Sequence, residues 1–248
     1  MPEQEPTRRE RYRRQTVAEI KSAAMGQLRE GGAETVSLNA IARSMAMSAP
    51  ALYRYFAGRD ELLADLAVDI HLALAGALEA AAARETSASA RVGAVANTYR
   101  DWALAQPHAY HLAYETTYGS ARDQAADRIA SAAQRCMDVF LGVVAEAGEP
   151  AAPSLPAALE QQIRRWNGGD GRRHLPSGVL HFGLVWWSRL HGLISLELGG
   201  HLTATGIDAA VLYRTEVEAM LDSLRHRVTP RSRVTSPSTS RRSITMRR

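Results

Sequence analysis

A short segment near the N-terminus combines small side chains with hydrogen-bond donors in an order that suits contact with nucleic acid. Small side chains let a backbone approach base edges closely. Tyrosine hydroxyls can donate hydrogen bonds to phosphates, and an arginine can reach a phosphate or the O6 and N7 atoms of guanine. The residues concerned are Ser48, Ala49, Pro50, Ala51, Tyr53, Arg54 and Tyr55.

Two predicted short helices would hold this segment in place. Ser37 can cap the first of them, and Ser48 can cap the second, with Pro50 in its first turn. Leu52 and Phe56 would fasten the second helix to a core. Two short helices joined by a tight turn match the helix-turn-helix pattern, in which the second helix enters the major groove of double-stranded DNA.

The residues before this pair supply a further helix. Thr16 and Glu19 have the spacing of a capping box, so a helix is expected from about Thr16 to the glycine pair at 31–32. Residues 1–15 are expected to form a disordered basic arm that carries five arginines. Such an arm could enter a minor groove or remain a solubilising tail.

Residues 16–63 also resemble the TetR/AcrR family of bacterial regulators, most specifically over residues 35–63. The spacing Leu52-Tyr53-x-x-Phe56, followed by Glu-Leu-Leu at 61–63, carries most of the resemblance. It implies that the third helix reads the major groove and that Arg59, which opens the fourth helix, contacts the DNA backbone. Ala46 departs from the glycine that is common in the family's turn, and Ala51 departs from the common threonine.

The residues and the resemblance together define the predicted DNA-binding set. Its members lie at the start of the second helix, along the third helix and at the start of the fourth. They are Thr35, Ser37, Ser48, Ala49, Pro50, Ala51, Tyr53, Arg54, Tyr55 and Arg59.

The remainder of the chain has helical periodicity throughout, so the predicted fold class is all-α. A long helix is expected from about residue 59 to residue 84. Further helices are expected near residues 87–105, 107–118, 121–147, 156–166, 177–199 and 207–227. The expected domains are the arm (1–15), a helix-turn-helix DNA-binding domain (16–62), a ligand-binding and dimerisation domain (63–227) and a disordered basic tail (228–248).

Aromatic and histidine side chains of the predicted second domain are candidates for a pocket. Pockets in helical bundles are mostly apolar with a few polar anchors, which predicts an apolar or aromatic small-molecule effector. The same side chains could instead fill the core. The spacing Trp187-x-x-x-His191-Gly192 resembles a signature of one class of TetR C-terminal domain. The ligand-binding candidates are Trp102, Tyr110, His111, Tyr114, Trp186 and Trp187.

The last two long helices are expected to form a homodimer interface. The resemblance implies a four-helix interface between two copies, although these helices could also pack only within one chain. A single recognition helix reads few base pairs, and pairing on a palindromic operator supplies the missing affinity. The predicted interface residues are Leu184, His191, Leu196, Val217, Leu221 and Leu224.

Catalytic and metal-binding patterns are weak in this sequence, so we expect no enzyme, no cofactor and no metal site. His108 and His111 have a spacing that would permit metal ligation, but no further ligands stand at a suitable spacing. Cys136 is the sole cysteine, which excludes an intrachain disulfide. It is interpreted as a buried structural thiol, with a redox sensor as the alternative.

The charge distribution agrees with binding to a polyanion at the chain ends. Residues 1–60 carry ten basic and seven acidic side chains, residues 61–226 carry thirteen and nineteen, and residues 227–248 carry seven arginines and no acid. With no apolar leader or membrane span expected, the sequence predicts a cytoplasmic, ligand-responsive transcriptional repressor whose effector alters the spacing of two recognition helices. The alternatives are an activator of the same fold and a helical ligand-binding protein without DNA recognition.

Overall fold

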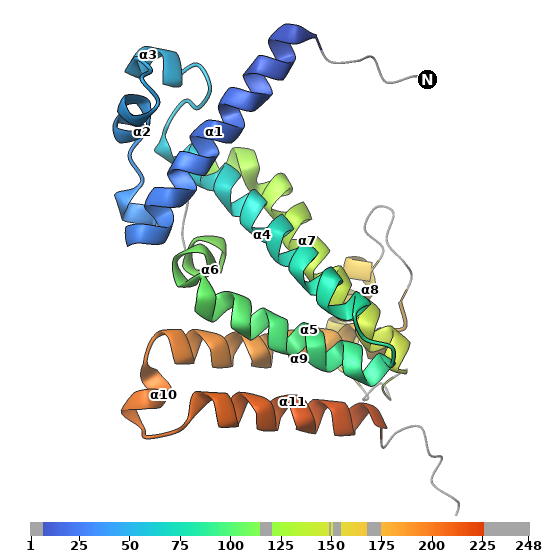
Figure 1. The fold of residues 1–248 in the computed structure, drawn as a ribbon. Coiled ribbons are helices and arrows are strands. Elements are labelled where there is room, and N and C mark those ends of the chain that lie inside the picture. The colour runs from blue at the N-terminus through green and yellow to red at the C-terminus, as the bar shows by residue number, and fades with distance from the viewer. Residues whose placement is uncertain (1–6, 115–120, 149, 151–154, 168–174, 226–248) are drawn as a thin grey trace, which may run out of the picture.

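The computed structural model describes residues 7–114, 121–148, 150, 155–167 and 175–225, and all regular structure within these ranges is helical (Figure 1). The elements are α1 (Arg8–Gly31), η1 (Ala33–Thr35), α2 (Leu38–Ser44), α3 (Ala49–Leu52), α4 (Arg59–Ala83), α5 (Ala88–Ala105), α6 (Pro107–Tyr114), α7 (Ala121–Ala147), α8 (Ala157–Asn167), α9 (Ser177–Leu198), α10 (His201–Ala204) and α11 (Ala209–Arg225). The all-α prediction is confirmed. The predicted tail at 228–248 and residues 1–6 of the predicted arm lie outside the described residues.

The first helix begins earlier than the sequence suggested. Thr7 forms the capping box: its side chain accepts a hydrogen bond from the Glu10 N–H at 3.3 Å, and its own N–H donates to the Glu10 carboxylate at 2.7 Å. Thr16 lies inside the helix, where its hydroxyl donates to the Tyr12 carbonyl oxygen at 3.0 Å. The prediction of a disordered arm was therefore wrong for residues 8–15, because an earlier Thr-x-x-Glu sequence supplies the cap.

Helices α1 to α3 enclose the N-terminal core. Helix α1 ends at Gly31, and Gly32 turns the chain at φ +80°, a conformation that favours glycine. Ser37 caps α2, as predicted, by accepting a hydrogen bond from the Ala40 N–H at 3.3 Å. The buried residues that these helices and their connections contribute are Ile20, Ala24, Leu28, Val36, Leu38, Ile41, Ala42, Leu52 and Phe56.

Helix α4 extends from the N-terminal core into a second core. Leu62 and Leu66 belong to the first, and Leu74 and Leu78 to the second. A helix that contacts neighbours on several sides is apolar over much of its circumference. For this reason α4 contains an 18-residue stretch whose mean hydropathy is 1.5. By length and composition alone, the helix could cross a membrane.

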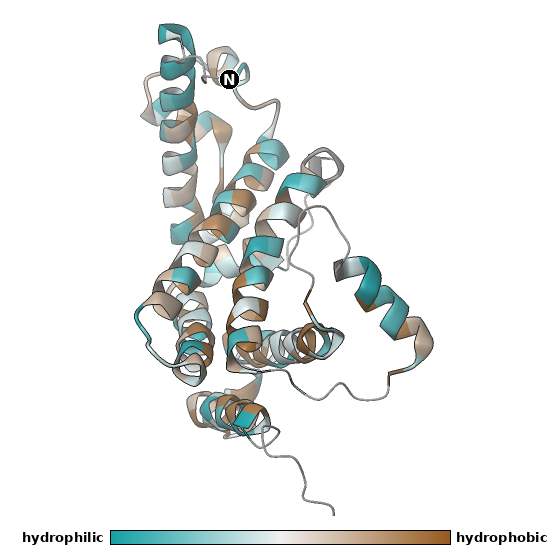
Figure 2. Ribbon diagram, turned by 90° about the vertical axis from the view of Figure 1, so that its right-hand side faces the viewer, coloured by the Kyte–Doolittle hydropathy of each residue, from teal (hydrophilic) through white to brown (hydrophobic). Residues whose placement is uncertain are grey.

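The C-terminal bundle places its two last long helices side by side, at the end of the molecule opposite α1 to α3 (Figure 1). Helices α4, α5, α7, α9 and α11 all contribute buried side chains to its core. Figure 2 shows that the upper turns of α1, in contrast, are hydrophilic all round. The apolar faces of the bundle therefore meet one another, whereas the start of α1 projects into solvent.

Helix α6 contributes to both cores. Ala109 and Leu112 are buried with the side chains of α1 to α3, and Tyr110 is buried in the C-terminal core. Trp102 of α5 is half-buried and packs against both cores. The N-terminal core thus extends beyond residue 62, the predicted domain boundary, to Ile70, Ala109 and Leu112.

Candidate nucleic-acid interface

The turn between α2 and α3 has the hydrogen bonding of a Schellman motif. The Met47 N–H donates to the Ala42 carbonyl oxygen at 2.8 Å, and the Ala46 N–H donates to the Arg43 carbonyl oxygen at 3.2 Å. Ala46 adopts φ +52°, where glycine is usual. This turn fixes the direction in which α3 leaves α2.

Helix α3 and the residues that flank it (48–56), here called the recognition segment, are anchored on one face and exposed on the other. Leu52 and Phe56 are 0% and 3% exposed, whereas Tyr53 is 47% exposed. Ser48 occupies the N-cap position of α3, as predicted, although its side chain makes no capping hydrogen bond. The other exposed members of the predicted set on this segment are Ser48, Pro50 and Arg54, and the half-buried members are Ala49, Ala51 and Tyr55.

Tyr55 lies against the start of α1. The Arg13 guanidinium carbon lies 5.2 Å from the centre of the Tyr55 ring, a cation–π contact. Arg13 therefore joins the exposed end of α1 to the end of the recognition segment. Sequence reasoning missed this contact, because it placed Arg13 in a disordered arm.

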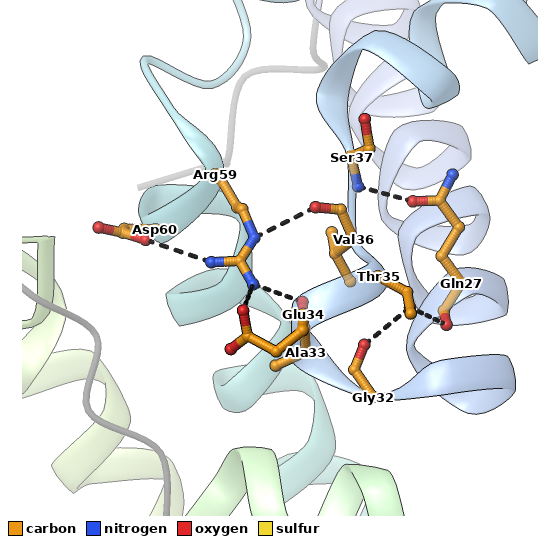
Figure 3. Close-up of polar contacts among 9 residues, drawn as sticks. All are labelled: Gln27, Gly32, Ala33, Glu34, Thr35, Val36, Ser37, Arg59 and Asp60. Atoms are coloured by element: carbon orange, nitrogen blue, oxygen red, sulfur yellow. Dashed lines mark hydrogen bonds and ion pairs between the residues drawn. The ribbon is translucent and has the colours of Figure 1, made fainter.

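Polar contacts of Gln27 hold the start of α2 (Figure 3). The Ser37 N–H donates to the Gln27 side-chain oxygen at 2.8 Å. The Thr35 hydroxyl lies 2.8 Å from the Gln27 carbonyl oxygen and 2.9 Å from that of Gly32. Thr35 and Ser37, which were predicted to contact DNA, thus also position α2, and Gln27 is a positioning residue that the sequence did not single out.

Arg59 is bound to the protein itself (Figure 3). Its Nη2 donates to the Ala33 carbonyl oxygen at 2.6 Å, and its Nε donates to the Val36 carbonyl oxygen at 3.2 Å. Ion pairs with Glu34 at 3.5 Å and Asp60 at 3.9 Å complete its surroundings. Arg59 therefore attaches α4 to the segment before α2, and its predicted contact with the DNA backbone stays a prediction.

A second candidate site is an aromatic cluster inside the C-terminal core. Nδ1 of His191 lies 3.0 Å from the Tyr99 hydroxyl oxygen and 2.9 Å from that of Tyr110. The Tyr110 hydroxyl is also 2.9 Å from Oγ of Ser195. The Tyr114 ring lies 4.9 Å from His191, and burial raises the pKa of Tyr114 well above its usual value. Tyr114 therefore stays uncharged at neutral pH, and the hydroxyl and imidazole groups form one polar centre among apolar walls.

Two buried polar atoms in this cluster have no hydrogen-bond partner among the described residues. They are Nε1 of Trp186 and Nδ1 of His71, in side chains that are 1% and 2% exposed. Trp186 packs edge-on against Phe140 at 5.4 Å, and His71 packs edge-on against Tyr114 at 5.1 Å. Burial lowers the pKa of His71, which leaves its ring neutral. An unsatisfied buried N–H costs about 1–3 kcal/mol, so a partner that accepts from Trp186 would be stabilising.

The structure brings most predicted ligand-binding residues together. Trp187 stacks on His191 with the ring centres 5.1 Å apart, and His111 contacts the Tyr110 ring at 6.1 Å. The Tyr110 and Tyr114 rings contact His191, and Trp186 joins the cluster through Phe140, whose ring lies 5.5 Å from that of Tyr99. Trp102 instead lies where the two cores meet.

The predicted dimer residues divide into two groups. Val217 and Leu224 are 5% and 4% exposed within the chain's own core, and His191 points into the aromatic cluster, so these three were wrong as interface residues. The reason is helical phase: α9 is apolar on more than one face, and the inward face of α11 consists of Tyr213, Val217, Met220 and Leu224. Leu196 is 43% exposed, while Leu184 and Leu221 are half-buried.

Cysteine and histidine chemistry adds no further site in the described ranges. Burial raises the pKa of the Cys136 thiol to about 12, and the thiol donates to the His71 carbonyl oxygen at 3.2 Å. This agrees with the structural role predicted for it. Among the described residues, no three His, Cys, Asp or Glu side chains lie together in a way that could hold a metal ion.

Comparisons with known families and relatives agree with this architecture. The family of tetR bacterial regulatory proteins matches residues 20–66, and the tetracyclin repressor-like C-terminal domain matches residues 92–220. An HTH-type transcriptional regulator of Mycobacterium tuberculosis strain H37Rv is 31% identical over 223 residues, which are 84% of this chain and 92% of that protein. A counterpart in Mycobacterium bovis has the same identity and coverage.

Solved structures show the same fold. The regulatory protein SCO4313 is 39% identical and superposes with a TM-score of 0.68, covering 87% of this chain and all of that one. A protein of unknown function from Rhodococcus sp. RHA1 is 26% identical with a TM-score of 0.62, over 83% of this chain and 93% of that one. The helix-turn-helix geometry and these matches lead to one conclusion: the chain belongs to the TetR family of bacterial transcriptional regulators.

Proposed function

We propose that this regulator is a cytoplasmic repressor that binds a palindromic operator as a homodimer and is released by a small molecule. The observation that carries the proposal is the two-sided character of the recognition segment. Leu52 and Phe56 hold it rigidly, while Ser48, Tyr53 and Arg54 face solvent. In the described residues, Arg54 makes no ion pair with a carboxylate, so its donors are available to DNA.

Selection from a randomised duplex pool at near-physiological salt tests this proposal. A palindrome should be enriched, and Arg54→Gln should weaken binding to it about 10-fold or more, as expected for a contact worth 1–3 kcal/mol. Tyr53→Phe should weaken it less, because one neutral hydrogen bond is lost. The control is Arg84→Gln, which makes the same charge change at the C-terminal end of α4, away from the recognition segment. Unselective binding would contradict the proposal.

Support for a homodimer comes from exposed apolar side chains on the two adjacent helices α9 and α11. Val185, Leu196 and Val211 are 37%, 43% and 47% exposed. Burying such residues against a second copy would remove apolar surface from water. Leu196→Glu should shift the protein from dimer to monomer in sedimentation velocity, whereas Leu72→Glu, at 42% exposure on α4, should not. Equal behaviour of the two variants would place the interface elsewhere.

The aromatic cluster is our proposed effector site. Its aromatic rings and the unpartnered Trp186 N–H fit an uncharged aromatic molecule that carries a hydrogen-bond acceptor. The probe is a panel of aromatic ketones and lactones, and the readout is release of a fluorescent operator. Trp186→Phe should raise the concentration of an active compound that is needed to release half of the operator about 10-fold. Trp166→Phe, whose N–H already donates to Gln134, is the control.

A panel without any active compound would contradict this effector class and leave operator binding standing. A compound that releases wild type and the Trp186→Phe variant equally would show that it does not accept from this N–H. The two readouts therefore separate the chemistry of the effector from the role of one group.

A further inference from the structure

The first two turns of α1 and the end of the recognition segment enclose a cleft of about 880 Å³. The start of α1 and α3 lie at the same end of the molecule (Figure 1). Arginines from both sides line the cleft. The lining residues are Thr7, Arg8, Arg9, Glu10, Tyr12, Arg13, Arg54 and Tyr55.

The positive charge of the cleft is not neutralised by the protein. In the described part of the chain, none of its four arginines forms an ion pair with a carboxylate. Glu10 is the acidic residue of the lining, and its carboxylate accepts from the Thr7 N–H at 2.7 Å and from the Thr7 hydroxyl at 2.9 Å. The backbone hydrogen bond from Thr7 lowers the pKa of Glu10, so this acid is charged but committed to the helix cap.

The arginines do not stabilise the helix that carries them. Arg9 and Arg13 stand four residues apart, a spacing at which like charges destabilise a helix. Both are exposed, so burial does not offset that cost. Arg13 is held over the Tyr55 ring, which directs its charge toward α3. A polyanion in the cleft would remove the repulsion.

We propose that this cleft binds backbone phosphates beside the base pairs that α3 reads, an inference that rests on the proposed DNA-binding function. A helix with its side chains is about 10–12 Å wide and cannot enter a minor groove of about 6 Å. The helical residues 8–15 therefore lie across the sugar–phosphate backbone, in contrast to an extended arm inside a groove. Arg9 and Arg13 supply phosphate contacts, and Tyr55 positions Arg13.

The helix itself offers a matched control. Arg11 and Arg14 are exposed on the same two turns but do not line the cleft. The variants R9Q/R13Q and R11Q/R14Q each remove two charges per chain, and glutamine preserves helix propensity. Circular dichroism of both variants verifies that α1 stays helical.

The measurement is the salt dependence of binding to the selected palindrome. Each phosphate contact contributes about 0.9 to the slope of log K against log salt concentration. A dimer of R9Q/R13Q loses four contacts, so its slope should be shallower by about 3.6. R11Q/R14Q should change the slope by less than half as much. Equal changes in the two variants, or a larger one in R11Q/R14Q, would overturn the proposal.

Base-substituted operators separate phosphate contact from base reading. R9Q/R13Q should weaken binding to the palindrome and to its substituted versions by the same factor. A reduced preference for the palindrome would overturn the assignment to phosphates. Failure of the proposed function has a different signature, because wild type would then select no palindrome. If unselective binding still lost its salt slope in R9Q/R13Q alone, the cleft would stand as a phosphate site without the repressor function.

Discussion

Ala46 occupies a backbone conformation that its side chain disfavours. It is the residue that follows the cap of α2, at φ +52°, and it is the sole non-glycine residue with positive φ in the described chain. An L-residue in the left-handed helical region costs about 1–2 kcal/mol. The Schellman hydrogen bonds of Ala46 and Met47 enforce this conformation. Ala46→Gly should therefore relieve strain in the turn that aims α3.

The magnitude follows from two opposing effects. Glycine avoids the clash of the β-carbon, but it loses about 0.5–1 kcal/mol more backbone entropy on folding than alanine does. Ala46 is exposed, so the substitution removes no core packing. The net prediction is that Ala46→Gly raises the free energy of unfolding by about 0.5–1 kcal/mol.

Urea unfolding and thermal melts test this reasoning. For a chain of this size, 1 kcal/mol corresponds to about 2–4 °C in Tm. Ala18→Gly is the control: Ala18 is exposed inside α1, at negative φ, and glycine there should destabilise by about 1 kcal/mol. If Ala46→Gly destabilised the protein as Ala18→Gly does, the argument from backbone strain would be refuted.

Three further substitutions test other contacts. Arg59→Gln should lower the free energy of unfolding by about 2 kcal/mol, because two part-buried carbonyl oxygens lose their donors. It should leave the salt slope of DNA binding unchanged, and a slope reduced by about 0.9 per chain would instead identify a phosphate contact. Glu197→Gln should lower the free energy of unfolding in urea by about 2 kcal/mol. It breaks a two-pronged ion pair with Arg100 at 2.8 and 2.5 Å, in which both side chains are 17% exposed. A change below about 0.5 kcal/mol would argue against a stabilising role for this pair. Burial raises the pKa of Cys136 to about 12 from 9.0, so its thiolate forms first in the unfolded chain. The free energy of unfolding should therefore fall by about 1 kcal/mol more between pH 9 and 10 in wild type than in Cys136→Ala. Parallel pH profiles of the two proteins would show that folding does not raise the pKa of this thiol.

Local signals in the sequence were sufficient to predict most of the long helices and the turn, although not the short helix α10 or the start of α1. Ser37 and Gly58 mark the starts of α2 and α4, and the glycine pair marks the end of α1. Leu52 and Phe56 were predicted as anchors from their spacing in a short helix, and both are buried. These features depend on residues close together in the chain, which is why a sequence reveals them.

The start of α1 was mispredicted because two Thr-x-x-Glu sequences compete. Both Thr7 and Thr16 satisfy the capping pattern, and the arginines between them favoured an unstructured arm. Only the structure shows that Thr7 is the cap and that Arg13 meets the Tyr55 ring. Contacts between distant segments decide this choice, and local patterns do not contain them.

The inner face of α9 could not be assigned from its sequence for a similar reason. The helix is apolar on several faces, so periodicity does not distinguish a core position from an interface position. His191 was placed at the interface, whereas its ring lies between Tyr99 and Tyr110. The unpartnered Trp186 N–H is likewise a property of the packed bundle and has no signature in the sequence.

Helix α6 provides a direct mechanical connection between the aromatic cluster and the DNA-binding helices. It has eight residues, so its two faces move together. Tyr110 faces the cluster, whereas Ala109 and Leu112 are packed in the N-terminal core. A molecule that displaces Tyr110 must therefore shift or repack that core. This connection adds to α4, which also contributes to both cores, because the His71 ring of α4 lies 5.1 Å from the Tyr114 ring of α6. Occupancy of the cluster can thus reach α3 through two helices that are attached to each other.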